Sequence, residues 1–182
     1  VTVSTAADKQ GTGIDFLFAS GATGNTHNPT VSFTGDHAFH HRMSLIKFTF
    51  KPGDGLIFNG MEPADYTLEG LKIEGTFDTA TGTTAVTAAV ESPITMQLGG
   101  ATTSQVIILP QEVTSSLNLK VSFNGQSYNA QLKLPETPTA NFYTAGYAYT
   151  YNITLNNKGI EVSDPTINPW ESGDSNDASA EL

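Results

Sequence analysis

The stretch DHAFHHR, residues 36–42, is the part of the sequence in which imidazole and carboxylate side chains crowd together. On an extended strand His37 and His41 would share one face, with His40 on the other. Imidazole suits zinc, copper and nickel, so a metal site comes into question. However, the spacing matches no established ligand motif, and Asp36 is the local carboxylate. The sequence therefore predicts no metal site, and we expect one histidine to pack or hydrogen-bond and the others to be solvated.

Patterns for nucleophilic, phosphate or calcium chemistry are absent. The sequence lacks G-x-S-x-G, and the glycine-containing stretch 21–26 is not followed by a helical pattern that could cradle a phosphate. Paired carboxylates for glycoside hydrolysis meet only in space, and Glu69, Glu74 and Asp78 read more simply as solvated surface charges. The stretch 173–177, GDSND, lacks the spacing of an EF-hand loop. We therefore predict no catalytic residue and no cofactor.

Two short patterns fit sugar attachment. Asn152-Ile153-Thr154 matches the N-glycosylation acceptor, which matters in a eukaryotic secretory pathway. Asp78-Thr79-Ala80 fits the Asp-Ser/Thr-apolar acceptor for O-glycosylation of exported Bacteroidetes proteins. Patterns this short arise easily by chance.

Charge and composition limit the class of partner. The 182 residues carry a formal net charge of -10, which opposes binding to nucleic acid and to anionic membranes. The chain has 0 cysteines, so disulfides and thiolate metal sites are excluded. No apolar run is long enough to span a membrane. The start, VTVSTAADKQ, shows no signal peptide, so an exported form would be a mature or trimmed one.

The clearest structural element is the stretch 117–134. Apolar and polar residues alternate on both sides of Asn124-Gly125, the strongest two-residue hairpin signal. Closing that turn places the two apolar sets on one face. The predicted opposed pairs are Val121 with Tyr128, Leu119 with Ala130, and Leu117 with Leu132.

A second alternating stretch, AGYAYTYNITLNNKGIEVSDPTINPW, runs over residues 145–170. Closing its turn at residues 156–159 would pair Leu155 with Ile160 and Ile153 with Val162. The row Tyr147, Tyr149 and Tyr151 continues into Ile153 and Leu155 on the same face. Aromatic faces stack on sugars, so a carbohydrate platform is one interpretation of the row. A face turned to the core is the simpler one.

The remaining strands are shorter. We expect strands in 14–20, 30–33, 43–51 and 68–78, and a central strand buried on both faces in 105–110. The stretch 84–92 could be a short strand or a helical turn. No segment has a convincing helical period. The fold class predicted from these elements is all-β, an antiparallel β-sandwich of about seven to nine short strands.

The C-terminal stretch resembles the signature of the fimbrillin family, the pilin-like surface proteins of Bacteroidetes. Two further stretches look like family strands, IDFLFA at 14–19 and FHHRMSLIKFTF at 39–50, and VIILP at 106–110 fits a short strand ended by proline. The matching C-terminal residues are Gly146, Tyr149, Tyr151, Ile153, Thr154, Leu155, Gly159, Ile160, Val162, Ile167, Pro169 and Trp170.

The resemblance implies two β-sandwich domains of transthyretin-like form, lipoprotein export with a lipid anchor on the precursor, and assembly by donor-strand exchange. Residues 1–28 would be the last strand of a truncated N-terminal domain plus a linker, 29–170 the C-terminal sandwich, and 171–182 an acidic flexible tail. Partners would be other pilin subunits and host or bacterial receptors or glycans, at the outer membrane or fimbrium.

Two further questions stay open at this point. The candidate strand-exchange residues are Ile160, Val162, Ile167 and Trp170, because an exchanged strand needs alternating side chains for pockets. The same segment could instead be an ordinary edge strand of its own sandwich. The function predicted is a non-enzymatic pilin-like subunit or adhesin module. The alternatives are a carbohydrate-binding sandwich module of a surface glycan-capture system and, more weakly, an accessory domain of an enzyme.

Overall fold

The structure is a computed structural model that describes residues 1–170, except 12, 28–29, 59, 61 and 157–158. The predicted tail 171–182 and the stretch GDSND lie outside the described residues. Two short 3-10 helices, η1 (Ala7–Lys9) and η2 (Gly35–His37), accompany the strands. The strands are β1 Thr2–Ser4, β2 Leu17–Phe18, β3 His40–His41, β4 Ser44–Pro52, β5 Asp65–Glu69, β6 Glu74–Asp78, β7 Thr83–Val86, β8 Ile94–Gln97, β9 Thr103–Ile108, β10 Gln111–Glu112, β11 Leu117–Phe123, β12 Gln126–Leu132, β13 Phe142–Tyr143, β14 Tyr147–Asn156, β15 Gly159–Val162 and β16 Thr166–Pro169.

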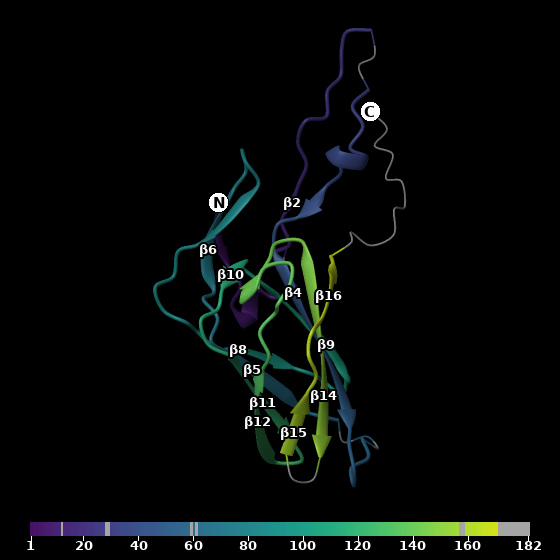
Figure 1. The fold of residues 1–182 in the computed structure, drawn as a ribbon, viewed down its shortest axis with the longest axis vertical. Coiled ribbons are helices and arrows are strands. Elements are labelled where there is room, and N and C mark those ends of the chain that lie inside the picture. Colours follow the sequence, from purple (N-terminus) through teal and green to yellow (C-terminus); the bar gives the residue numbers. More distant parts are fainter. Residues whose placement is uncertain (12, 28–29, 59, 61, 157–158, 171–182) are drawn as a thin grey trace.

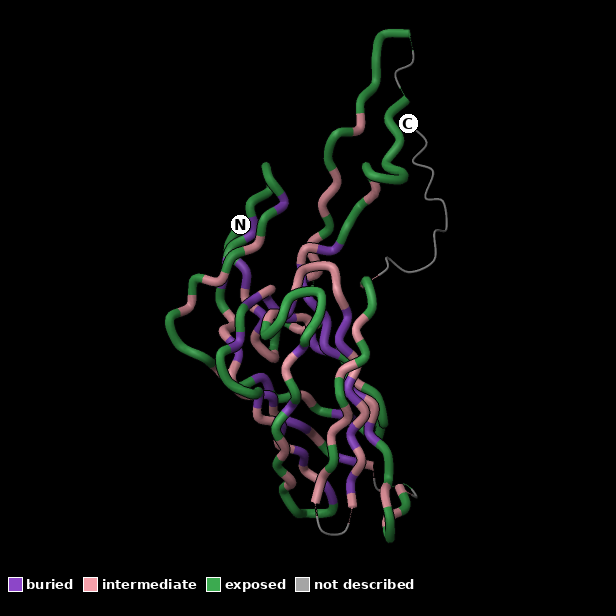
Figure 2. The backbone as a smooth tube through the Cα atoms, viewed as in Figure 1, coloured by how far each residue is buried: buried purple, intermediate pink, exposed green. Residues whose placement is uncertain are grey.

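Two sheets form a sandwich, which confirms the predicted all-β class (Figure 1). One sheet has the order β12-β11-β5-β8, and the other has the order β15-β14-β4-β9, with β16 also paired to β14. Their facing sides share one core, in which the ring of Phe48 on β4 meets that of Tyr66 on β5 edge-on at 5.0 Å. Figure 2 shows buried residues recurring along the strands of the two sheets. More strands are present than predicted, because several are only two to four residues long.

The hairpin of β11 and β12 has the predicted register. Val121 lies opposite Tyr128, Leu119 opposite Ala130, and Leu117 opposite Leu132. The turn places Asn124 at a φ of 48° and Gly125 at 71°, the two positive values that a type I′ turn requires. Sequence alternation and turn chemistry therefore set this pairing by themselves.

Strand β14 forms the middle of the larger sheet and breaks its antiparallel pattern. It pairs with β15 as predicted, Leu155 opposite Ile160 and Ile153 opposite Val162. Its other edge runs parallel to β4, with Ala148 beside Leu45. The predicted antiparallel sandwich therefore contains one exception, because the ladder between β4 and β14 is parallel. Residue alternation reports which face a side chain takes and contains no information about the direction of the neighbouring strand.

Strand β9 lies at the border of its sheet, so the prediction of a central strand in 105–110 is wrong. Its outer edge is covered by a side chain instead of a strand. The amide of Gln10 accepts a hydrogen bond from Ile107 N at 2.9 Å and donates one to Ile107 O at 3.0 Å. This bidentate contact satisfies both backbone groups of Ile107, which would otherwise be unpaired at the sheet edge.

Other predicted strands are shorter or missing. The stretch 30–33 forms no strand, and 14–20 contains only the two-residue β2. The stretch 68–78 is divided between β5 and β6, because Gly70 takes a φ of 100°, outside the strand region.

Residues before 19 pack onto the side of the sandwich. Strand β1 pairs with β6, which also pairs with β7, and Val3 lies opposite Gly75. The ring of Phe16 stacks on that of Phe77 at 4.7 Å. Residues 19–27 and 30–39 then extend away from the sheets as two mostly exposed segments (Figures 1 and 2). The division into segments 1–28 and 29–170 stays a prediction.

Candidate functional site

The four residues predicted to exchange strands lie along one edge of the larger sheet. Ile160 and Val162 on β15 and Ile167 on β16 are half-buried and pack against the main core. Trp170 follows β16 and packs against a second, smaller cluster. Both strands pair with the edge of β14 that β4 leaves free. In this structure the segment therefore closes its own sandwich.

Strand β16 has few contacts of its own to hold it there. It pairs with β14 over four positions, from Tyr147 opposite Pro169 to Thr150 opposite Thr166. Ile167 is its half-buried residue, and the other three are exposed. Pro169 has no N–H to give to the ladder. The ladder is short and solvent-exposed, and such strands open at little cost in free energy.

The end of β16 is fixed by Trp170. Its backbone N–H donates to Gly146 O at 2.7 Å. Its indole lies face to face with the imidazole of His41, with ring centroids 3.9 Å apart and planes 3° apart. His41 Nδ1 is in turn 2.8 Å from Asp15 Oδ1. We call Asp15, His41 and Trp170 the His41 clasp.

The His41 clasp joins three distant parts of the chain. Asp15 precedes β2, His41 lies on β3, and Trp170 ends the described residues. His41 is only 8% exposed, and its Nε2 has no hydrogen-bond partner among the described residues. An ionised carboxylate only accepts hydrogen bonds, so the contact with Asp15 places a proton on Nδ1. Asp15 thereby fixes the orientation of the ring against the indole.

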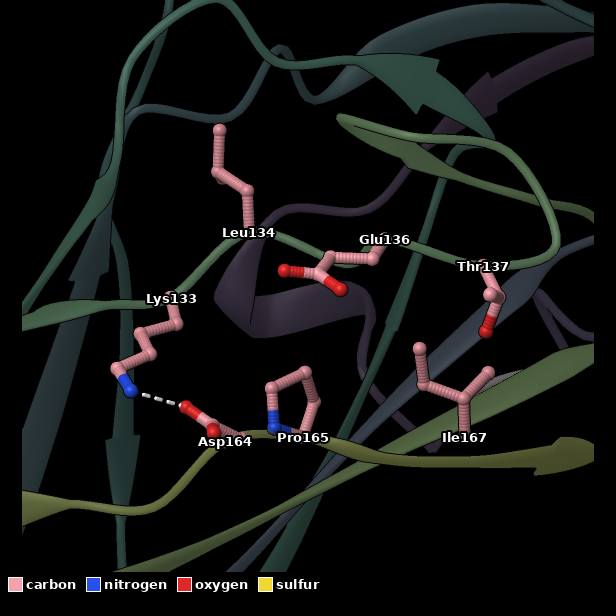
Figure 3. A pocket seen from close by; sticks show the side chains of 7 residues that line it. All are labelled: Lys133, Leu134, Glu136, Thr137, Asp164, Pro165 and Ile167. Atoms are coloured by element: carbon pink, nitrogen blue, oxygen red, sulfur yellow. Dashed lines mark ion pairs between the residues drawn. The ribbon is translucent and has the colours of Figure 1, made fainter.

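A pocket of about 280 Å³ borders the same edge. It is lined by residues that follow β12, among them Leu134 and Glu136, by the β15–β16 connection, and by Ile167 on β16. An ion pair between Lys133 and Asp164 lies at its rim (Figure 3). Figure 3 shows the Glu136 carboxylate across the pocket from Pro165.

The tyrosine row faces the core, as its simpler interpretation predicted. Tyr149 and Tyr151 are both 0% exposed, so neither can stack on a sugar in this structure. Tyr151 donates from its hydroxyl to Lys133 O at 2.8 Å and lies 3.0 Å from the hydroxyl of Tyr143. Burial raises the pKa of Tyr151 to about 12 and the pKa of Tyr143 well above its usual value. These hydroxyls are therefore neutral hydrogen-bonding groups of the core.

The histidine stretch 36–42 is spread out in space. His41 is the member that packs and hydrogen-bonds, as predicted for one of them. His40 is exposed, and the exposed His37 lies 2.8 Å from Ser20 O through its Nδ1. Within the described residues no three histidine, aspartate or glutamate side chains lie close enough to hold a metal ion.

The candidate carboxylates make ordinary surface contacts. Hydrogen bonds from Lys120 and then from Asn118 lower the pKa of Glu69. Ser4 donates to Glu74 at 2.7 Å, and Asp78 accepts from Ala80 N at 2.8 Å. The three acids bind different partners and do not form a pair across a cleft.

The two acceptor patterns for sugar attachment differ in accessibility. Asn152 lies inside the ladders of β14, where its backbone N–H donates to Ser163 Oγ at 3.0 Å. Thr79 is exposed in the turn after β6. Among the described helices none is long and apolar enough to cross a membrane.

Sequence reasoning identified Trp170 but missed what it binds. Asp15 carries no local signal, because its partner His41 lies 26 positions away. The pocket residues Lys133 and Asp164 also gave no signal, since each reads as a solvated charge. The resemblance did place both His41 and Trp170 in family-like stretches, and the structure brings the two together.

The match to a known family covers every residue that the structure describes. The model of the fimbrillin-like family matches residues 1–170. No curated protein matches the chain.

Several solved structures share the fold. A candidate cell adhesion protein from Bacteroides uniformis superposes with a TM-score of 0.77 at 19% identity, over 94% of this chain and 66% of its own. Another from Bacteroides ovatus gives 0.72 at 23% identity, over 96% and 61%. The tip fimbrial protein Mfa3 from Porphyromonas gingivalis, with C-terminal truncation, gives 0.51 at 11% identity, over 82% and 60%. The chain thus spans less than two thirds of the length of each.

Proposed function

The chain belongs to the fimbrillin-like family, and from this premise we propose that it is a non-enzymatic, pilin-like subunit of the cell surface. The family match over residues 1–170 is the observation that carries the proposal. The all-β sandwich and the fimbrial and adhesion proteins that share its fold support it. Its partners are other fimbrial subunits, and its place is the fimbrium or outer membrane, reached by a lipid-anchored precursor.

We also propose that subunits join by strand exchange through residues 159–170. An exchanged strand gains affinity from backbone hydrogen bonds and specificity from alternate side chains. Two observations support this segment as the exchanging part. Its strands lie at a sheet edge, and β16 is held there by a ladder of four pairs. Contact with host or bacterial receptors and glycans is the adhesive role that we propose for the assembled fimbria.

Antibody labelling of intact cells tests the first proposal. Gold-labelled antibody against this chain should decorate fimbriae or the outer surface in electron micrographs. Labelling that requires lysed cells would rule out a surface subunit.

A pair of cysteines tests strand exchange. Thr150 and Thr166 lie directly opposite each other on β14 and β16, and both point to the outer face of the sheet. Opposed residues in antiparallel strands are close enough for a disulfide, and the chain has 0 cysteines of its own. In T150C/T166C, exchange predicts disulfides between copies and a ladder on non-reducing gels of assembled material. Assemblies whose disulfides all stay within one copy would refute exchange through β16.

The carbohydrate-binding alternative has lost the platform on which it was based. Tyr149 and Tyr151 are buried, and one face of the Trp170 indole is covered by His41.

A further inference from the structure

We infer that the His41 clasp is the contact that holds β16 on its own sheet and that it couples this strand to the N-terminal segment. The inference deepens the proposed function and rests on it for its role in assembly.

The ladder of β16 cannot hold the strand firmly by itself. Its four positions include Pro169, and Ile167 supplies its half-buried apolar contact. β15, on the same edge of β14, has two half-buried apolar residues, Ile160 and Val162. Protection against opening follows buried contact and backbone bonding. β16 is therefore the more easily released of the two strands.

The end contact compensates for this weakness. The indole of Trp170 is parallel to the imidazole at 3.9 Å, and its backbone N–H is bonded to Gly146 O at 2.7 Å. Stacked aromatic pairs add stability beyond the area that they bury. The ring of His41 is also held at its edge, since Asp15 bonds its Nδ1 and only 8% of the residue is exposed. A ring that is already held loses little freedom when the indole stacks on it.

Asp15 extends the coupling to the N-terminal segment. The same segment accepts a backbone hydrogen bond from Arg42 N to Phe16 O at 2.8 Å and stacks Phe16 on Phe77. Displacement of residues 14–18 would remove the carboxylate that orients His41. Because coupling between two sites is reciprocal, loss of Trp170 must also loosen residues 14–18. The state of the N-terminal segment thus sets how readily β16 leaves.

An open clasp frees both surfaces that strand exchange needs. Residues 163–170 become available to a second copy of the chain, and the β14 edge from Tyr147 to Thr150 loses its partner. A closed clasp keeps both occupied within one molecule. The clasp therefore acts as a self-blocking contact that must open before copies join through β16.

Hydrogen exchange on the unassembled chain tests the clasp directly. His41→Ala should raise the exchange rate of the Trp170 amide by roughly tenfold, the size expected from losing one stacked aromatic pair. The emission of Trp170, the 1 tryptophan of the chain, should shift to longer wavelength in the same variant. His40→Ala is the matched control, because His40 is the exposed neighbour. Asp15→Asn should have an intermediate effect on both measurements.

Two further measurements complete the test. Trp170→Ala should accelerate exchange of the Arg42 amide, while the control Asn168→Ala on the exposed face of β16 should not. Exchange in the β11–β12 hairpin should stay unchanged in every variant. The inference is overturned if His41→Ala behaves like His40→Ala, or if amide exchange accelerates in all strands together. In either case the His41 clasp does not hold β16 specifically.

The role of the His41 clasp and the proposed function can be refuted independently of each other. The exchange rates concern a monomer, so they stand even if no fimbria contains the chain. Adding His41→Ala to T150C/T166C should increase the share of disulfides between copies. If the share of disulfides between copies is unchanged while the Trp170 amide exchanges faster, the clasp does hold β16, but its role in strand exchange is refuted.

Discussion

Two tyrosine hydroxyls in the core should contribute unequally to the free energy of unfolding, although they contact each other. Tyr151 donates to Lys133 O at 2.8 Å, so its single proton is used there. The contact of 3.0 Å between the Tyr143 and Tyr151 hydroxyls must then be donated by Tyr143. Both residues are 0% exposed, so water cannot replace a lost partner. The Tyr151 hydroxyl therefore takes part in two hydrogen bonds and the Tyr143 hydroxyl in one, so their removal should destabilise the fold by different amounts.

Tyr151→Phe breaks both bonds, so the buried O–H of Tyr143 is left unpaired and the carbonyl of the exposed residue Lys133 also loses its hydrogen bond. A buried group without a partner costs about 1–3 kcal/mol, so we expect a loss of roughly 2–3 kcal/mol in the free energy of unfolding. Tyr143→Phe breaks one bond and leaves only a lone pair of Tyr151 unused. Its expected cost is about 0.5–1.5 kcal/mol, the net value of one ordinary hydrogen bond.

Urea denaturation of the unchanged chain, Tyr151→Phe and Tyr143→Phe measures the difference in the free energy of unfolding. For a chain of this length, 1 kcal/mol shifts the melting temperature by about 2–4 °C, so Tyr151→Phe should melt roughly 4–12 °C lower. Tyr128→Phe is the control, since the Tyr128 hydroxyl bonds Gln126 at the surface and its loss should stay within about 0.5 kcal/mol. The reasoning is refuted if Tyr143→Phe costs as much as Tyr151→Phe, or if Tyr151→Phe resembles the control.

Three other perturbations have defined outcomes. Gln10→Ala uncovers the border strand β9, so the Ile107 amide should exchange faster and stability should fall by about 1–2 kcal/mol in urea titrations. Gly75→Ala should lower the melting temperature more strongly, by the equivalent of about 2–3 kcal/mol, because the new Cβ would lie 2.5 Å from Ala85 O. Burial raises the pKa of Tyr66 to about 12, so the fold favours its neutral form. This contribution to stability is complete below a pH of about 10, is lost as the pH rises toward about 12, and should disappear from the pH dependence of the urea midpoint in Tyr66→Phe.

Local pairing was predictable, and long-range pairing was not. Both hairpins took the register that alternation and turn residues demanded, because a slip of one position would move every apolar side chain to the wrong face. The parallel pairing of β4 with β14 had no comparable signal. The stretch 105–110 is apolar on both faces although it borders its sheet, since the Gln10 amide and the N-terminal residues cover it.

In the candidate site, too, local features were predictable from the sequence and long-range contacts were not. Ile160, Val162 and Ile167 were identified by alternation, and each is half-buried against the core. For Trp170, the sequence indicated a candidate strand-exchange residue but not its stacking partner. Contacts such as those of His41 with Asp15 and Trp170 depend on the folded path of three segments, which no local pattern encodes.

The parallel ladder of β4 and β14 fixes when the larger sheet can form. Leu45 and Ala148 are partners in it, on the order of 100 residues apart, and such distant pairings form late. A ribosome adding about 5–20 residues per second needs roughly 5–20 s to pass from one partner to the other. During that interval the edge of β4 that later meets β14 has no partner strand, and its apolar face can bind other chains. Chaperones that recognise extended apolar segments have this interval in which to act, and translational pauses before Ala148 would lengthen it.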